Sequence, residues 1–135
     1  MGAKKLVSTY IDEVWNNGDL DALEDLTTTS FTYHLGGQKP RDLMGMKQFL
    51  STIREAFPDW QVEVDDVVVE GVLAAIRWSG KATHLGPFHG VPATGKQISV
   101  SGMNFYRLED GKIAQEWEQM DSLGMLGDMG LLPPT

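Results

Sequence analysis

Asp121 is the side chain whose type and place in the sequence best fit acid–base chemistry. The Glu-Asp-Gly-Lys sequence at residues 109–112 predicts a two-residue hairpin turn, because Asp-Gly readily takes the positive φ angles that this turn requires. Counting outwards from the turn pairs Asn104 with Trp117. The same count predicts that Asp121 lies at the end of the second strand of the hairpin.

Side chains of the predicted hairpin alternate between two faces. One face is expected to carry Val100, Asn104, Tyr106, Leu108, Ile113, Gln115, Trp117, Gln119 and Asp121. The other is expected to carry Met103, Phe105, Arg107, Ala114, Glu116, Glu118 and Met120. Charged side chains such as Glu116 and Glu118 are rarely buried, so we expect the first face to point inwards. Asn104, Trp117 and Gln119 would then line a substrate pocket.

Two interpretations of Asp121 remain open at this point. On a mostly apolar inner face beside Trp117, its carboxyl group would be partly desolvated, and its pKa would rise towards the range useful for proton transfer. Alternatively, the Asp-Ser-Leu-Gly sequence at 121–124 is a good helix start, in which Asp121 caps backbone amides. The first interpretation predicts a catalytic residue and the second a structural one.

Histidines and two helix residues complete the candidate site. His34, His84 and His89 fit no standard zinc-ligand spacing, and the chain has no cysteine, so we expect no metal. We place His34, at the end of a short strand, and His84, beside a long connection rich in glycine and proline, among the substrate-binding residues. Tyr10 and Phe49, on the apolar faces of two predicted helices, are expected to contact the substrate as well.

The composition limits the partners and the compartment. The 135 residues carry a formal net charge of −8. An acidic chain lacks the clustered cationic charge that nucleic acid or an anionic membrane requires, and no apolar run is long enough to span a bilayer. We therefore expect a cytoplasmic protein with a small-molecule partner. Without thiols, dinucleotide motifs or a phosphate loop, any chemistry is expected to be acid–base chemistry with no cofactor.

Helices come first and strands last along the chain. Apolar residues recur at helical spacing over residues 3–16 and 43–57, and a short helix is predicted at 20–26. A brief strand is predicted at 31–34, and beyond the second long helix the apolar period changes from 3.6 to 2. This order favours an α+β architecture. With no linker or repeat, residues 1–135 are expected to form a single domain.

Several motifs occur in an order and spacing that resemble one family. They are Val-Trp-Asn-Asn-Gly-Asp-Leu-Asp at 14–21, Phe-Pro-Asp at 57–59, Gly-Lys-Ala-Thr-His-Leu-Gly at 80–86, Val-Pro-Ala-Thr-Gly-Lys at 91–96, Ser-Gly-Met at 101–103, and Asp-Gly-Lys-Ile at 110–113 followed by Glu116, Trp117 and Asp121. Over nearly the whole chain, the sequence resembles the SnoaL-like polyketide cyclases, or ester cyclases, of the nuclear transport factor 2-like (cystatin-like) superfamily.

The resemblance implies a fold and a reaction. The fold is an α+β cone, in which a curved antiparallel sheet packs on the N-terminal helices around an internal pocket. The reaction is an intramolecular aldol closure of a hydrophobic, carbonyl-containing polyketide ester. Asp121, which matches the family's late aspartate, is implied to be the general acid and base. The protein would hold the reacting carbons close together and place one carboxylate beside the acidic proton.

Other activities of the superfamily fit the residues less well. A ketosteroid isomerase would need a tyrosine donor and a second buried acid; Tyr33 and Tyr106 are candidate donors, but no second buried acid stands out. An epoxide hydrolase would want an Arg-x-Asp sequence on a neighbouring strand, which neither Arg77 nor Arg107 provides.

A non-catalytic protein is the alternative to the cyclase. It would be a small-molecule-binding or structural dimer of the same fold, with Asp121 serving as a helix cap. In either case we expect a homodimer or homotetramer, because Met103, Phe105 and Met120 would make the outer face of the sheet apolar.

Overall fold

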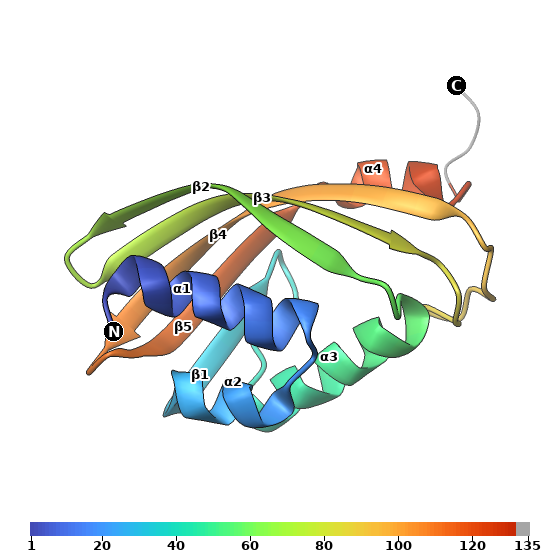
Figure 1. The fold of residues 1–135 in the computed structure, drawn as a ribbon. Coiled ribbons are helices and arrows are strands. Elements are labelled where there is room, and N and C mark those ends of the chain that lie inside the picture. Colours follow the sequence, from blue (N-terminus) through green and yellow to red (C-terminus); the bar gives the residue numbers. More distant parts are fainter. Residues whose placement is uncertain (132–135) are drawn as a thin grey trace.

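The computed structural model describes residues 1–131 as a curved five-stranded sheet with helices packed against it (Figure 1). The elements in chain order are α1 (Ala3–Tyr10), η1 (Ile11–Asn16), α2 (Leu20–Leu26), β1 (Thr27–Leu35), α3 (Leu43–Ala56), β2 (Gln61–Glu70), β3 (Leu73–Thr83), β4 (Gln97–Glu109), β5 (Lys112–Met120) and α4 (Ser122–Asp128). The predicted α+β class is confirmed. The last four residues of the predicted domain, 132–135, lie outside the described residues.

The sheet has the strand order β1-β5-β4-β3-β2. β1 pairs with β5 in parallel, and each of the other neighbouring pairs is antiparallel. The sheet arches over α1, α2 and α3, which cover its concave face (Figure 1). β5 therefore lies inside the sheet, with a hydrogen-bonded strand on each side.

Side-chain caps and apolar spacing explain where the helices start. α1 and η1 together cover the predicted helix at 3–16, and η1 continues the helix as a wider π-type turn. The Asp19 carboxylate accepts backbone N–H groups at the start of α2, and the Asp42 carboxylate accepts from Gly45 N at the start of α3 (2.9 Å).

The core lies between the concave face of the sheet and the helices. Leu6 of α1, Leu50 of α3 and Ile76 of β3 are almost fully buried there. α3 is also tied to the first helical segment, because the guanidinium group of Arg54 donates to the backbone oxygen of Trp15 (2.7 Å). Any internal cavity is thus bounded by the sheet on one side and by helices on the other.

The β4–β5 hairpin departs from its predicted register by one residue. The two turn residues have φ angles of 52° and 75°, as expected, and Leu108 pairs with Ile113. The next residue of β4, however, pairs with Gln115, so Ala114 has no partner across the ladder. Ile113 and Ala114 are both buried although they are adjacent in the strand, which is typical of a β-bulge.

The bulge reverses the two faces of β5, because one extra residue turns every later side chain to the other side. Asn104 pairs with Glu118 and not with Trp117. Glu116 and Glu118 point towards the helices and are only 0% and 6% exposed. The prediction that these glutamates are solvated is wrong, and so is the prediction that Trp117 and Gln119 point inwards.

Candidate active site

A cavity of about 230 Å³ lies between the sheet, α3 and the α4 segment. Its walls are mostly aromatic and sulfur-containing, and include Trp15, Phe49, Phe57, Trp60, Trp78, Phe88, Met120, Met125 and Met129. Met120 belongs to this wall and not to the outer face, because the bulge turns it inwards with the glutamates. Among the described residues that line the cavity, Glu118 is the one carboxylate.

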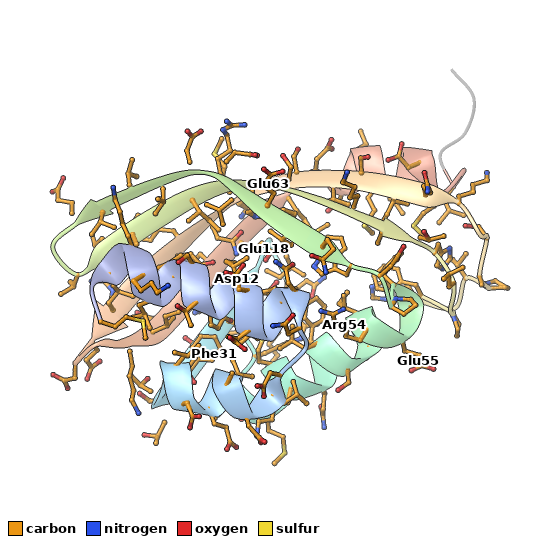
Figure 2. All side chains as sticks on the ribbon, viewed as in Figure 1. Asp12, Phe31, Arg54, Glu55, Glu63 and Glu118 are labelled. Carbon is orange, nitrogen blue, oxygen red and sulfur yellow. The ribbon has the colours of Figure 1, made fainter. Side chains whose placement is uncertain are left out.

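Glu118 presents its carboxyl group to the cavity from the middle of the sheet. Figure 2 shows it between the sheet and α1, whereas Glu55 and Glu63 lie on exposed surfaces. Asn104 Nδ2 donates to Glu118 Oε1 at 3.1 Å. Burial raises the pKa of Glu118 to about 7, although the hydrogen bond from Asn104 opposes this rise. A carboxyl group that titrates near neutrality can both take up and return a proton at physiological pH.

Glu116 lies next to Glu118 on the same face of β5 and is completely buried. Tyr10 Oη donates to Glu116 Oε1 at 2.6 Å, and Asn104 Nδ2 donates to Glu116 Oε2 at 2.9 Å. Burial, and then the charge of Glu118, raise the pKa of Glu116 to about 8. Neither glutamate takes part in a salt bridge within residues 1–131.

Asn104 joins the two carboxyl groups because its amide is held in one orientation. Trp78 Nε1 donates to Asn104 Oδ1 at 2.8 Å, which leaves the NH₂ group facing the carboxyl oxygens. Asn104 and Glu118 also border a second, smaller cavity of about 10 Å³. That volume is close to the minimum needed for a single water molecule.

Three buried donors near Glu118 have no hydrogen-bond partner in the described part of the chain. Trp15 and Trp60 line both cavities, and their indole N–H groups are unpaired. The Tyr33 hydroxyl is unpaired as well; burial, and then the charges of Glu118 and Glu116, hold the pKa of Tyr33 well above its ordinary value. Buried N–H groups nearly always find a partner, so the indole N–H groups of Trp15 and Trp60, whose side chains line the cavities, are available to a ligand, whereas Tyr33 lines neither cavity.

Asp121 lies outside this cavity, at the start of α4. It is exposed, and its Oδ1 accepts the backbone N–H of Gly124 at 2.9 Å. This is the geometry of the helix cap, the second of the two interpretations drawn from the sequence. The expected inner-face position is wrong, because the bulge at Ala114 puts residues 116, 118 and 120 on the inner face.

His34, Trp117 and Gln119 lie away from the cavity as well. His34 and Trp117 are neighbours on β1 and β5, and their rings stack with centroids 5.1 Å apart and planes 14° apart. Gln119 is exposed. The structure therefore brings His34 and Trp117 together, but on the outer face of the sheet beside Phe105.

Phe49, Tyr10 and His84 have three different surroundings. Phe49 lines the cavity, and its contact with a substrate stays a prediction. Tyr10 contacts Glu116 in the buried network and does not border either cavity described above. His84 is fully buried, with its Nδ1 at 2.9 Å from Thr94 Oγ1, which fits a histidine that stabilises the long connection after β3.

Sequence reasoning missed Glu116, Glu118, Trp15 and Trp60. Their charge predicts that the two glutamates face water, and a regular register without the bulge places them on the outer face of β5. A usable signal was the inward position of Asn104, because a buried amide on β4 needs polar partners on the neighbouring strand. The glutamates supply those partners once Ala114 is allowed to bulge.

These features define a small α+β domain with a ligand-sized cavity and a buried network of carboxyl groups at its wall. The chain belongs to the SnoaL-like polyketide cyclase family, whose model matches residues 5–129. This confirms the family that the sequence motifs indicated, together with its nuclear transport factor 2-like fold.

Solved structures agree with this assignment. The chain is similar to IdmH, a candidate polyketide cyclase from Streptomyces antibioticus, with 31% identity over 94% of this chain and 97% of that chain and a TM-score of 0.82. It is also similar to AclR, a candidate hydroxylase from Streptomyces galilaeus, with 27% identity, 98% and 87% coverage and a TM-score of 0.86. A candidate SnoaL-like polyketide cyclase from Jannaschia sp. CCS1 shares 25% identity, with 96% and 92% coverage and a TM-score of 0.87. No curated protein matches the chain.

Two further observations concern metals and membranes. Residues 1–131 contain no group of three or more histidine, aspartate or glutamate side chains arranged to hold a metal ion. Within the same residues, no helix has the length and apolar character needed to cross a bilayer.

Proposed function

We propose that the protein is a cyclase-type enzyme that closes a ring by intramolecular aldol addition on a hydrophobic carbonyl compound, with Glu118 as its general base and acid. The observation that carries the proposal is the position of Glu118, a buried carboxyl group with a pKa near neutrality, in the wall of an aromatic cavity. Glu118 replaces Asp121 in the role that the sequence motifs suggested.

The proposed reaction requires one proton to move twice. The Glu118 carboxylate removes a proton from a carbon next to a carbonyl group, which leaves an enolate. The enolate carbon attacks a ketone or aldehyde carbon of the same molecule and forms the new carbon–carbon bond. The resulting alkoxide takes the proton back from Glu118. The reaction needs no oxidant, reductant or second reactant. Besides the base, the protein contributes by holding the substrate folded with its reacting carbons close together.

Trp15 and Trp60 are the proposed donors to the enolate oxygen. Their indole N–H groups are buried, have no partner within the described residues, and belong to side chains that border the cavity beside Glu118. Donors that are already in place where negative charge develops lower the barrier without reorganisation during the reaction.

The cavity also limits the size and shape of the proposed substrate. A volume of about 230 Å³ lies below the range of about 300–1,000 Å³ that is common for small-molecule pockets. The aromatic walls favour a flat ring system of about two fused rings. The exposed Gln38, His89 and Ser122 at the open end would face polar substituents of the substrate.

Deuterium exchange tests the proton-transfer step without knowledge of the natural substrate. The bicyclic ketone 2-tetralone has acidic carbon-bound protons, and NMR in D₂O follows their replacement by deuterium. We expect the wild-type protein and Asp121→Asn to accelerate the exchange and Glu118→Gln to lose the acceleration. Equal acceleration by Glu118→Gln and the wild type would rule out Glu118 as the base. Binding of 2-tetralone with no acceleration by the wild type would instead support the non-catalytic binding protein.

A further inference from the structure

The mechanism above uses Glu118 but leaves the second buried carboxyl group without a role. Glu116 is 0% exposed and borders neither cavity described above. It is nevertheless connected to Glu118, because Asn104 Nδ2 donates both to Glu116 Oε2 (2.9 Å) and to Glu118 Oε1 (3.1 Å). The Asn104 amide cannot rotate away from the two carboxyl groups without losing the hydrogen bond that Trp78 Nε1 donates to its oxygen.

No lysine, arginine or histidine of residues 1–131 forms a salt bridge with either glutamate of the pair. The groups that face it are Tyr10 from α1, Tyr33 from β1, and Asn104 and Tyr106 from β4. Tyrosines and an amide can donate hydrogen bonds, but they do not neutralise two carboxylates. Two negative charges on one buried strand face repel each other strongly, so such a pair titrates as a unit that retains one proton.

The surroundings decide which carboxyl group holds that proton. Glu118 borders the cavity, where water or a polar ligand can solvate its charge. Glu116 is enclosed by protein; the hydrogen bonds that its oxygens accept from Tyr10 and Asn104 favour the ionised form, but burial outweighs them. Desolvation penalises a charge most where solvation cannot be recovered.

We propose that Glu116 is a positioning residue that holds the shared proton of the pair, so that Glu118 is the ionised member facing the cavity, oriented through Asn104. The inference rests on the proposed function for its link to catalysis, whereas the proton assignment concerns the two glutamates alone. The pKa directions agree with it, because burial and the neighbouring Glu118 charge raise the pKa of Glu116.

Carboxyl NMR of protein labelled with ¹³C at glutamate Cδ tests the assignment without any substrate. In Glu116→Gln, an uncharged amide replaces the protonated acid, so the titration midpoint of Glu118 should stay within about 0.5 pH units of its wild-type value. In Glu118→Gln, the midpoint of Glu116 should fall by about one unit or more, because the neighbouring charge is gone. Glu63→Gln, on an exposed position of β2, should leave both midpoints unchanged.

The opposite pattern overturns the assignment. If Glu116→Gln lowers the midpoint of Glu118 by a unit or more, Glu116 was the ionised member. Should one variant fail to fold, the other still decides, because the expected shift of the titration midpoint in each variant differs from the shift that the opposite assignment predicts. Wild-type midpoints of both carboxyl groups at the ordinary glutamate value would also overturn it.

The activities of two Glu116 variants separate a positioning role of Glu116 from a role in packing alone. Glu116→Gln should retain exchange of 2-tetralone at pH 7 within about two-fold, whereas Glu116→Met, which removes the acceptor of Tyr10 Oη and one of the two acceptors of Asn104 Nδ2, should lose about tenfold or more. Equal activity of the two variants would contradict the positioning role. If Glu118→Gln is fully active, the proposed function fails, and the NMR titrations still decide the proton assignment.

Discussion

Glu118 and Asp121 are three residues apart in the chain, yet they occupy opposite kinds of site. Glu118 is on the inner face of β5, in the wall of an aromatic cavity, and accepts a hydrogen bond from a buried amide. Asp121 is exposed and accepts a backbone N–H at the first turn of α4. What a carboxyl group can do therefore depends on whether it lies on the buried inner face of the sheet or on the surface. Its distance in sequence from a motif does not show which of these applies.

The largest expected effect separates the two carboxyl groups by activity. If the protein closes rings as proposed, Glu118→Gln should lower kcat by about 10²–10⁴-fold, which is the usual contribution of a general base. The rate of the wild type should rise with pH as Glu118 ionises around pH 7. Steady-state kinetics across pH 5–9 measure both effects. Asp121→Asn should keep the wild-type kcat and its pH dependence. If its kcat fell as far as that of Glu118→Gln, the two carboxyl groups would not differ in function as proposed.

A smaller effect on activity is expected at the donors beside Glu118. Replacing Trp60 with 3-benzothienylalanine keeps the ring shape but substitutes sulfur for the indole N–H, and should lower kcat by about 10–100-fold. The affinity for an analogue that cannot form an enolate should change little. The same replacement at Trp117, on the outer face of the sheet, is the control. An unchanged kcat would show that the cavity donors do not act on the enolate.

Stability should depend on pH through Glu118. Its folded-state pKa of about 7 lies above the ordinary glutamate value, so the folded state binds a proton more tightly than the unfolded state. The free energy of unfolding should therefore fall as pH rises from 5 to 7, by at most about 1.4 kcal/mol per pH unit for this one group. Urea titrations should give a flatter curve for Glu118→Gln than for the wild type or Glu63→Gln. Parallel curves would mean that Glu118 titrates normally.

The smallest expected effect concerns the cap. Asp121→Ala removes the acceptor for Gly124 N and should reduce the free energy of unfolding by about 1 kcal/mol. Asp121→Asn, which keeps an oxygen acceptor, should lose less than that. Thermal unfolding measures the difference between the variants. The activity of Asp121→Ala and of Asp121→Asn should stay within about two-fold of the wild type, unlike the activity of Glu118→Gln.

The sequence predicted the layers of the fold better than the details of the site. Apolar spacing located the helices, and the Asp-Gly turn located the β4–β5 hairpin, because both are short-range effects of backbone geometry. The bulge at Ala114 was not predictable in this way, since alanine has no strong preference for one and the gain comes from contacts across the sheet. That single residue decided whether Glu118 or Trp117 points into the cavity.

The position of β5 within the sheet has a consequence for how the cavity exchanges its contents. β5 is hydrogen-bonded to β1 on one side and to β4 on the other, whereas α4 is a seven-residue helix that contributes Met125 to the cavity wall. Amide hydrogen exchange should therefore be slow along residues 115–119 and much faster along α4. A base at Glu118, as proposed, would therefore stay fixed on β5 even when the part of the cavity wall that α4 contributes unfolds locally.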